Sequence, residues 1–245
     1  MSEESFRENY NIKNYDVPLF TVDMVIFTVE AQDLKVLLVQ RTAAPFKNTW
    51  ALPGGFCDLK VDTSIEDTAF RKLREKTGIT SPYLEQVETI GNATRDPRGW
   101  AVTTLYFALI DFSAILNDGQ SGSEPMQWVS VDEAQQIGLA FDHHVLLSRA
   151  LDRLKTKTQY TSLPIGLMPD EFTLSELQSM YELILGGKVQ SKSFRRRLEA
   201  SDILKQTGEM RPTSRRPAAL YRRSGSFENN YVFSGLLDSK PSNGG

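Results

Sequence analysis

Cysteine is almost absent from this sequence of 245 residues, and long apolar runs are missing altogether. With Cys57 alone, no disulfide can form within the chain, which is typical of proteins that fold in a reducing compartment. No run of about 18 apolar residues occurs, which excludes a membrane-spanning helix. Residues 1–16 are polar and acidic early on, without the basic flank and apolar stretch of a secretory signal. The sequence therefore predicts a cytoplasmic protein with no membrane partner.

Acidic residues are scarce in one late segment. Residues 186–223 contain eleven Lys or Arg and three acids, a net charge of +8. Because the whole chain carries −3, the remainder carries −11. An acidic body with a strongly basic late segment indicates that this segment meets a polyanion.

The first part of the chain, residues 17–157, predicts an α/β body that follows the polar segment 1–16. Apolar and β-branched runs predict strands at 19–29, 35–40, 83–90, 101–110 and 127–131. Helices are expected at 64–77, ended by Gly78, and at 143–154, with Asp132 starting a short helical turn between them. Leu147, Ala150, Leu151 and Leu154 form one apolar stripe on the 143–154 helix. Mixed strands with interspersed helices are typical of an α/β fold.

The sequence changes character at residues 155–169, which are polar and then contain prolines and glycine, as in a linker. A second unit, residues 158–223, includes a helix opened by a capping box at Thr173 and Glu176 and stopped by Gly186. We expect another helix at 191–205 and an exposed two-stranded ribbon at 210–221, where prolines disfavour a central strand. The tail 224–245 is rich in Gly, Ser and Asn and is expected to be disordered, unless residues 231–233 dock on the body.

Residues 54–79 resemble the Nudix box, Gly-x5-Glu-x7-Arg-Glu-U-x-Glu-Glu-x-Gly-U, where U is bulky and aliphatic. Arg71, Leu73, Glu75, Gly78 and Ile79 match, and Gly55 lies two residues too far upstream. Nudix enzymes are α/β/α sandwiches that cleave nucleoside diphosphates with divalent metal held by the glutamates of the box. Here Thr63, Lys72 and Lys76 stand where the family has Glu. Because ammonium groups repel a dication, we expect no metal site and no catalytic residues, although Asp62, Glu66 or Asp67 can restore one ligand by a register shift.

The lysines of the box leave two interpretations open. Lys72, Lys76 and Arg71 can replace the metal as counter-charge for a pyrophosphate. Alternatively, the lysines are solvated surface and Arg71 pairs with Glu75. For Asp142, His143 and His144 we favour a helix N-terminus capped by Asp142 over a metal site, since adjacent histidines point in different directions on a helix.

Three further stretches carry a closer resemblance: PFKNTWALPGGF (45–56), RDPRGW (95–100) and LAFDHH (139–144). They are similar to ADP-ribose pyrophosphatases and to the NrtR family, the Nudix-related regulators of NAD metabolism, and with the second unit the likeness to NrtR covers residues 17–223. The resemblance implies a Nudix sandwich with a mixed sheet, a C-terminal winged helix-turn-helix, ADP-ribose as effector and no required cofactor. The expected ligand-binding residues are Arg41, Phe46, Gly54, Gly55, Phe56, Arg71, Lys72, Lys76, Arg95, Arg98 and Tyr106. The arginines suit phosphate or ribose, and Phe46 or Tyr106 suits adenine stacking, although ordinary core packing is the alternative for Trp50, Phe56 and Tyr106.

The helix predicted after Ser191 has an apolar edge at Phe194 and Leu198 and a basic face opposite. With a capped helix before it, a short glycine-containing turn and a basic ribbon after it, this pattern favours duplex DNA over RNA or an acidic protein. The expected DNA-binding residues are Lys188, Gln190, Ser191, Lys192, Arg195, Arg196, Arg215 and Arg216. We therefore expect a homodimeric, ADP-ribose-responsive repressor of NAD biosynthesis or salvage genes in a bacterial cytoplasm. The alternatives are an active ADP-ribose pyrophosphatase and an RNA-binding adaptor.

Overall fold

Strand β1 (Leu19–Glu30) is the centre of the body because most of its side chains are buried on both faces of the sheet. The computed structural model describes residues 2–78, 83–113, 124–213, 216–224, 232–233 and 236. β1 pairs antiparallel with β2 (Asp33–Gln40) across a tight turn and with β4 (Gly54–Phe56), and it pairs parallel with β6 (Ala101–Leu109). The sheet order is β3-β2-β1-β6-β5, with β3 at Trp50–Ala51 and β5 at Tyr83–Asn92, and β7 (Met126–Ser130) joins β2.

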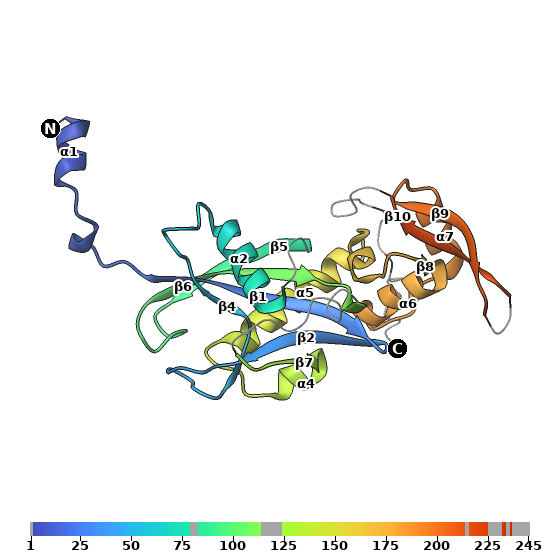
Figure 1. Cartoon of the computed structure of the whole chain (residues 1–245), viewed down its shortest axis with the longest axis horizontal. Helices are drawn as coiled ribbons and strands as arrows, with labels where there is room; N and C mark the ends of the chain where they lie inside the picture. The colour runs from blue at the N-terminus through green and yellow to red at the C-terminus, as the bar shows by residue number, and fades with distance from the viewer. Residues whose placement is uncertain are drawn as a thin grey trace, which may run out of the picture.

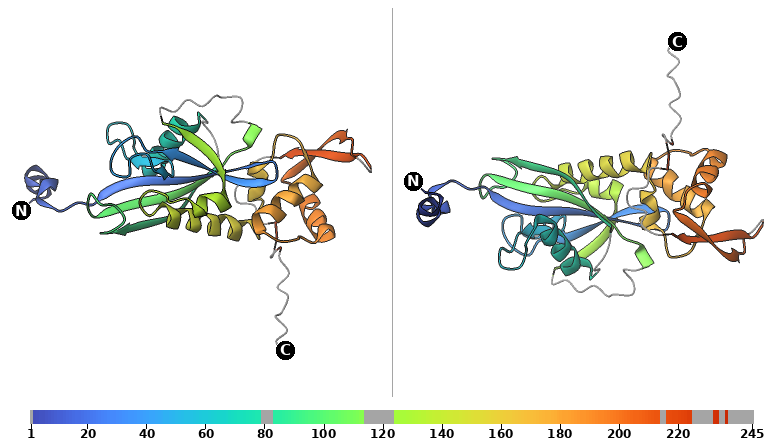
Figure 2. Two further views of the ribbon diagram at one scale, coloured as in Figure 1. Left: turned by 90° about the horizontal axis from the view of Figure 1, so that it is seen from below. Right: turned by 90° about the horizontal axis from the view of Figure 1, so that it is seen from above.

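Helices cover both faces of this mixed sheet (Figure 2). On one face lies α2 (Ile65–Thr77), capped by Ser64 and ended by Gly78 in the left-handed conformation, as the sequence predicts. On the other lie α4 (Val131–Gln136) and α5 (His143–Thr158), whose predicted apolar stripe is buried. The predicted α/β/α sandwich is confirmed. The start of α4 differs from the prediction, because Ser130 accepts the capping hydrogen bond from the N–H of Glu133 and Asp132 lies inside the first turn.

The second unit is a small helical pair with a three-stranded sheet. Helix α6 (Leu174–Leu185) has the predicted capping box at Thr173 and Glu176. The turn at Gly186 leads to α7 (Ser191–Glu199). Strands β8 (Phe172–Thr173), β9 (Leu204–Arg211) and β10 (Ala218–Arg223) are arranged in the order β8-β10-β9. The predicted winged helix-turn-helix is confirmed, with a ribbon longer than expected.

Helix α7 is shorter than the predicted helix 191–205. It ends at Glu199, where the hydroxyl of Ser201 donates to the carbonyl of Leu198 and Asp202 follows in a turn. The chain then enters β9 at Leu204, with Ile203 buried beneath. Pairing with β10 therefore overrides the helical preference of the last residues.

The prediction that residues 155–169 form a linker is wrong. Helix α5 continues to Thr158, and residues 161–168, which include the 3-10 helix η2 (Leu163–Leu167), are buried. Leu163 and Ile165 are fully buried in a core that extends from the sandwich to α6 and α7. The alternating apolar residues of this segment outweigh its proline and glycine, so the two units share one core.

Both ends of the described chain hold further structure: the sequence predicted no element before β1, and it left open whether residues 231–233 dock on the body. Residues before β1 form α1 (Glu3–Asn9) and the 3-10 helix η1 (Ile12–Asn14), which project from the end of the body opposite the winged helix (Figure 1). Beyond β10, Val232 and Phe233 lie against the body, and Phe233 is buried. None of the described helices is long and apolar enough to cross a membrane.

Candidate functional site

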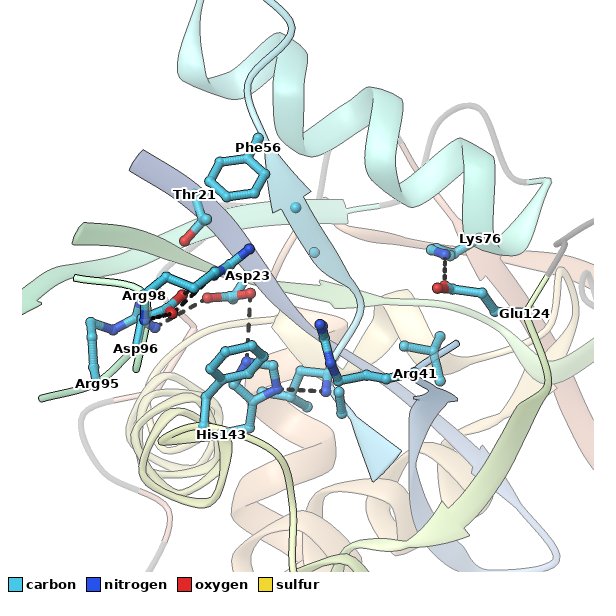
Figure 3. A pocket seen from close by; sticks show the side chains of 16 residues that line it. Thr21, Asp23, Arg41, Phe56, Lys76, Arg95, Asp96, Arg98, Glu124 and His143 are labelled. Carbon is cyan, nitrogen blue, oxygen red and sulfur yellow. Dashed lines mark hydrogen bonds and ion pairs between the residues drawn. The ribbon is translucent and has the colours of Figure 1, made fainter. Parts of the chain in front are cut away.

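A cavity opens beside the glycine-containing strand β4, and we call it the glycine-loop cavity (Figure 3). It lies between the β1–β4 edge, the loop that follows β5 and the start of α5. Seven of the residues predicted to bind ligand line it: Arg41, Gly54, Gly55, Phe56, Lys76, Arg95 and Arg98. The sequence pattern therefore located the cavity, while the roles predicted for these residues still require a binding measurement.

Gly54 is required by the close packing of β4 against β1. A Cβ at this position would lie 2.4 Å from Oδ1 of Asp23 and 2.5 Å from the carbonyl oxygen of Val22. Both distances are shorter than van der Waals contact, so any side chain here would push β4 away from β1. Gly55 has φ of 150°, a region that favours glycine. The two glycines thus let the backbone form one wall of the cavity.

The floor of the cavity is a buried polar network around Arg95 (Figure 3). The Arg95 guanidinium donates to Asp142 at 3.0 and 3.1 Å and to Asp23 at 3.3 Å. Asp142 starts α5 as predicted, but its carboxylate binds Arg95 and makes no capping hydrogen bond. The carboxylates of Asp142 and Asp23 therefore neutralise the charge of Arg95, which leaves little positive charge for a phosphate.

His143 completes this floor. Its Nδ1 accepts a hydrogen bond of 2.8 Å from the N–H of Leu52, and its Nε2 lies 3.8 Å from Oδ1 of Asp23. Burial lowers the pKa of His143, although the Asp23 and Asp142 carboxylates oppose the shift. The imidazole is thus neutral at pH 7, with its proton on Nε2 facing Asp23. This contact ties the first turn of α5 to the cavity.

Arg41 supplies the uncompensated positive charge of the cavity. Its guanidinium donates to the carbonyl oxygens of Pro45 at 2.8 Å and Ala43 at 3.4 Å, and no carboxylate of the described residues lies within ion-pair distance. Burial, and next the charge of Arg98, lower the pKa of Arg41. A guanidinium without a carboxylate partner at a cavity wall is suited to bind an anion.

Aromatic rings lie beside two arginines of the cavity, Arg41 and Arg98. The Arg41 guanidinium lies 4.7 Å from the ring centroid of Phe141, and that of Arg98 lies 5.1 Å from Phe56. Arg98 is also paired with Asp96 at 2.7 Å. The cavity thus combines planar cations and rings, which suit phosphates and an aromatic base, with the carboxylates of Asp23 and Asp96, which can accept from sugar hydroxyls.

Most carboxylates of the Nudix-box segment are held by neighbouring groups. Arg71 donates to Asp62 at 2.7 Å and to Glu75 at 3.0 Å, and Lys72 lies 2.9 Å from Glu75. The Arg71 guanidinium holds the pKa of Asp62 well below its usual range. Of the residues the structure describes, no three His, Cys, Asp or Glu are grouped so that they could hold a metal ion. Asp62 and Glu75 are engaged by cations and Asp67 accepts from the N–H of Thr63, so these three carboxylates do not fit a catalytic metal.

Four residues predicted to bind ligand lie outside the cavity lining. Arg71 and Lys72 are held in the ion pairs of α2, so the structure supports the predicted pairing of Arg71 with Glu75. The idea that the lysines are solvated surface is wrong, because Lys72 and Lys76 are mostly covered and ion-paired. Tyr106 is buried in the core between the sheet and α2, which confirms the core-packing alternative for this residue. Phe46 is half-exposed and packs on Phe141 at a centroid distance of 4.7 Å. Only Lys76 of the three box cations reaches the cavity, and it is paired with Glu124.

Sequence reasoning missed several residues of the cavity: Asp23, Asp96, Glu124, Phe141 and His143. An acid such as Asp23 within the apolar run of β1 is a signal, because a buried carboxylate needs a partner. The partner itself, Arg95, is 72 residues away in sequence, so only the fold reveals the pair.

The second candidate surface is the exposed side of α7. Phe194 and Leu198 are fully buried, while Lys192, Arg195 and Arg196 are exposed, as the helical wheel predicts. The Arg195 guanidinium donates to the hydroxyl of Ser175 on α6 at 2.9 Å. The apolar edge of α7 therefore packs against α6, and its basic face is exposed.

Three residues predicted to bind DNA have structural bonds at the turn before α7. The Gln190 side chain caps α7 by accepting from the N–H of Ser193 at 2.7 Å, and the Ser191 hydroxyl accepts from Gln178 at 2.9 Å. Lys188 is paired with Glu182, although its side chain is 91% exposed. Arg216 is exposed on the loop between β9 and β10, and Arg215 lies outside the described residues.

Comparisons with known proteins identify this arrangement. Residues 164–223 match the model of the NrtR DNA-binding winged helix domain, and residues 19–150 match that of the NUDIX domain. An ADPR-responsive transcriptional repressor from Acinetobacter baylyi is 53% identical over 90% of this chain and 88% of its own length. The chain belongs to the NrtR family.

Two solved structures of this family are similar to the fold. Shewanella oneidensis NrtR complexed with a 27mer DNA has 43% sequence identity and a TM-score of 0.81, covering 89% of this chain and 99% of its own. The NUDIX domain of the same protein complexed with ADP-ribose has 46% identity and a TM-score of 0.57, covering 63% and 99%.

Proposed function

We propose that this NrtR-family protein is a transcriptional repressor that binds operator DNA through α7 and is released from it by ADP-ribose bound in the glycine-loop cavity. The observation that carries the proposal is the combination, in one continuous core, of an anion-suited cavity with Arg41 uncompensated and a winged helix with a basic exposed face. The A. baylyi relative is an ADPR-responsive repressor, and the S. oneidensis relatives bind a 27mer DNA and ADP-ribose.

The DNA contacts divide by side-chain chemistry. Arg196 and Arg195 can read guanine edges in the major groove, while Lys192, Lys188 and the wing residue Arg216 contact phosphate or the minor groove. A homodimer places two such helices on an inverted repeat, with half-sites separated by whole turns of the duplex. Genes of NAD biosynthesis or salvage are the expected targets, because ADP-ribose derives from NAD.

Release requires ADP-ribose to bind one arrangement of the dimer better than another. The buried packing of residues 161–168 argues against free rotation of the two units about this segment. We infer that ADP-ribose acts through α5, whose first residue, His143, lines the glycine-loop cavity and whose last turn adjoins the winged helix.

Binding of the upstream DNA of the protein's own gene, titrated with ADP-ribose, tests this function. We expect nanomolar binding at moderate salt that weakens as ADP-ribose saturates the protein. Binding that ignores ADP-ribose, or that does not distinguish this DNA from random duplex, would contradict the proposal. AMP and NAD serve as ligand controls, since each lacks part of ADP-ribose or adds to it.

The same protein incubated with ADP-ribose and Mg²⁺ tests the enzymatic alternative. Because Lys72 and Lys76 replace carboxylates and Glu75 is paired, we expect no formation of AMP and ribose 5-phosphate at a practical rate. Turnover at rates usual for enzymes would show that the site recruits metal from elsewhere, and the pyrophosphatase would then be the better description.

A further inference from the structure

The chain returns to the body after the winged helix has ended. β10 stops at Arg223, where the match to the winged-helix model also stops, yet Val232 and Phe233 lie against the junction of the two units. The backbone N–H groups of Val232 and Phe233 both donate to the carbonyl oxygen of Tyr160, at 2.9 and 3.1 Å. Phe233 is only 6% exposed. This segment is therefore docked through both backbone and side chain.

Phe233 completes a cluster of three rings with one residue from each helix of the helix-turn-helix. Its ring stacks parallel on Phe194 of α7, with centroids 5.5 Å apart and planes 2° apart. It also meets Tyr181 of α6 edge to face at 5.5 Å, and Tyr181 meets Phe194 at 5.0 Å. Such ring pairs add geometric preference to apolar burial. Phe233 thus fixes both the position and the tilt of the Phe194 side chain.

The same cluster is tied to the junction by a further hydrogen bond. The hydroxyl of Tyr181 donates to the carbonyl oxygen of Thr161 at 2.8 Å, and burial raises the pKa of Tyr181, so this donor keeps its proton. Tyr160 and Thr161 lie two and three residues beyond the end of α5 at Thr158. The end of α5 therefore holds Phe233 through Tyr160 and Tyr181 through Thr161.

Helix α7 depends on this cluster for its placement. It has only nine residues and buries Phe194 and Leu198, while Arg195 and Arg196 follow Phe194 directly on the exposed face. A change in how Phe194 packs therefore moves the guanidinium groups that would reach base edges. Reading of base edges depends on such placement, whereas attraction to phosphates depends mainly on charge.

We propose that Phe233 is a positioning residue that links α5 to the DNA-reading helix α7. The link begins at the glycine-loop cavity with His143, runs along α5 for about 24 Å at 1.5 Å per residue, and reaches Phe194 through Tyr160 and Phe233. Its regulatory role rests on the proposed function. The segment that follows the winged helix holds α7 in the position that binds operator DNA, and a change at the glycine-loop cavity reaches α7 through this segment.

Three substitutions in the full-length protein test this role. Phe233→Ala removes the ring, Phe233→Leu keeps apolar bulk without the stack, and Ile203→Ala removes buried bulk elsewhere in the same domain. A chain shortened to residues 1–238 keeps Phe233 and controls for the rest of the tail. Circular dichroism and thermal unfolding establish that each variant is folded at the assay temperature.

Two readouts distinguish positioning from general destabilisation. The first is the ratio of operator to random-duplex affinity without ADP-ribose, which we expect Phe233→Ala to lower by roughly tenfold or more. Its random-duplex affinity and salt dependence stay as in the wild type, because every cation remains. The second is the factor by which ADP-ribose weakens operator binding, expected to fall from the range of roughly 5–150 typical of coupled sites to near 1.

The controls decide the interpretation. Phe233→Leu should fall between the wild type and Phe233→Ala in both ratios, while Ile203→Ala and the shortened chain should keep both. Wild-type ratios in Phe233→Ala, or an equal loss in Ile203→Ala, would overturn the proposal. A wild-type protein whose operator binding ignores ADP-ribose would refute the proposed function instead, and the operator to random-duplex ratio would still judge whether Phe233 positions α7.

Discussion

Removal of the Arg41 guanidinium is the sharpest test of the glycine-loop cavity. In Arg41→Ala the fold loses one short and one long hydrogen bond to backbone carbonyls and no ion pair with a described residue, a cost of about 1.5–3 kcal/mol. A bound diphosphate loses charge-assisted hydrogen bonds, which contribute about 1.5–3 kcal/mol. At about 1.4 kcal/mol per factor of ten, the dissociation constant for ADP-ribose should rise about 10- to 150-fold.

Titration calorimetry with ADP-ribose measures this effect directly. Arg41→Lys keeps a point charge but loses the planar fork, so we expect an intermediate affinity. Arg74→Ala, which removes an exposed arginine from α2, is the matched control and should bind as the wild type does. Operator affinity without ADP-ribose should stay the same in all three. A dissociation constant for Arg41→Ala within about threefold of the wild type, in a folded protein, would refute the assignment of Arg41 to the phosphates.

Three further changes probe other parts of the molecule. Arg196→Ala should weaken operator binding by about 1–3 kcal/mol and leave ADP-ribose binding intact. Unchanged discrimination between operator and random duplex would contradict the assignment of Arg196 to base edges. Arg71→Ala should lower the melting temperature without weakening the binding of ADP-ribose, because Arg71 neutralises Asp62 away from the cavity. A loss of ADP-ribose affinity in this variant would instead favour Arg71 as a phosphate contact. The pKa of His143 is lowered by burial, so its contribution to stability is present above its unfolded value of about 6.5 and is lost as the pH falls below it. Melting curves between pH 7 and 5 should therefore show a decline that is smaller in His143→Gln, and equal slopes would contradict the burial of a neutral imidazole.

The sequence by itself determined most of the helices and strands and the locations of both candidate surfaces. Hydrophobic runs, caps and glycines specify α2, α5 and α6 because these preferences act within a few residues of one another. The stretches at 45–56, 95–100 and 139–144 and the amphipathic pattern of Phe194 and Leu198 are equally local, and they were sufficient to predict the family, the cavity wall and the basic helix.

The tertiary structure alone decided which polar groups are free and how the two units meet. Arg71, Lys72 and Arg95 are all cations in the sequence, but their partners differ, and Arg95 meets Asp23 only because β1 and the loop after β5 converge. Segment 155–169 has the composition of a linker, yet its apolar residues join a core whose other half lies in α6. Burial and pairing depend on residues distant along the chain, so Arg41 is distinguished from its neighbours, and Phe233 from the rest of the tail, by the fold.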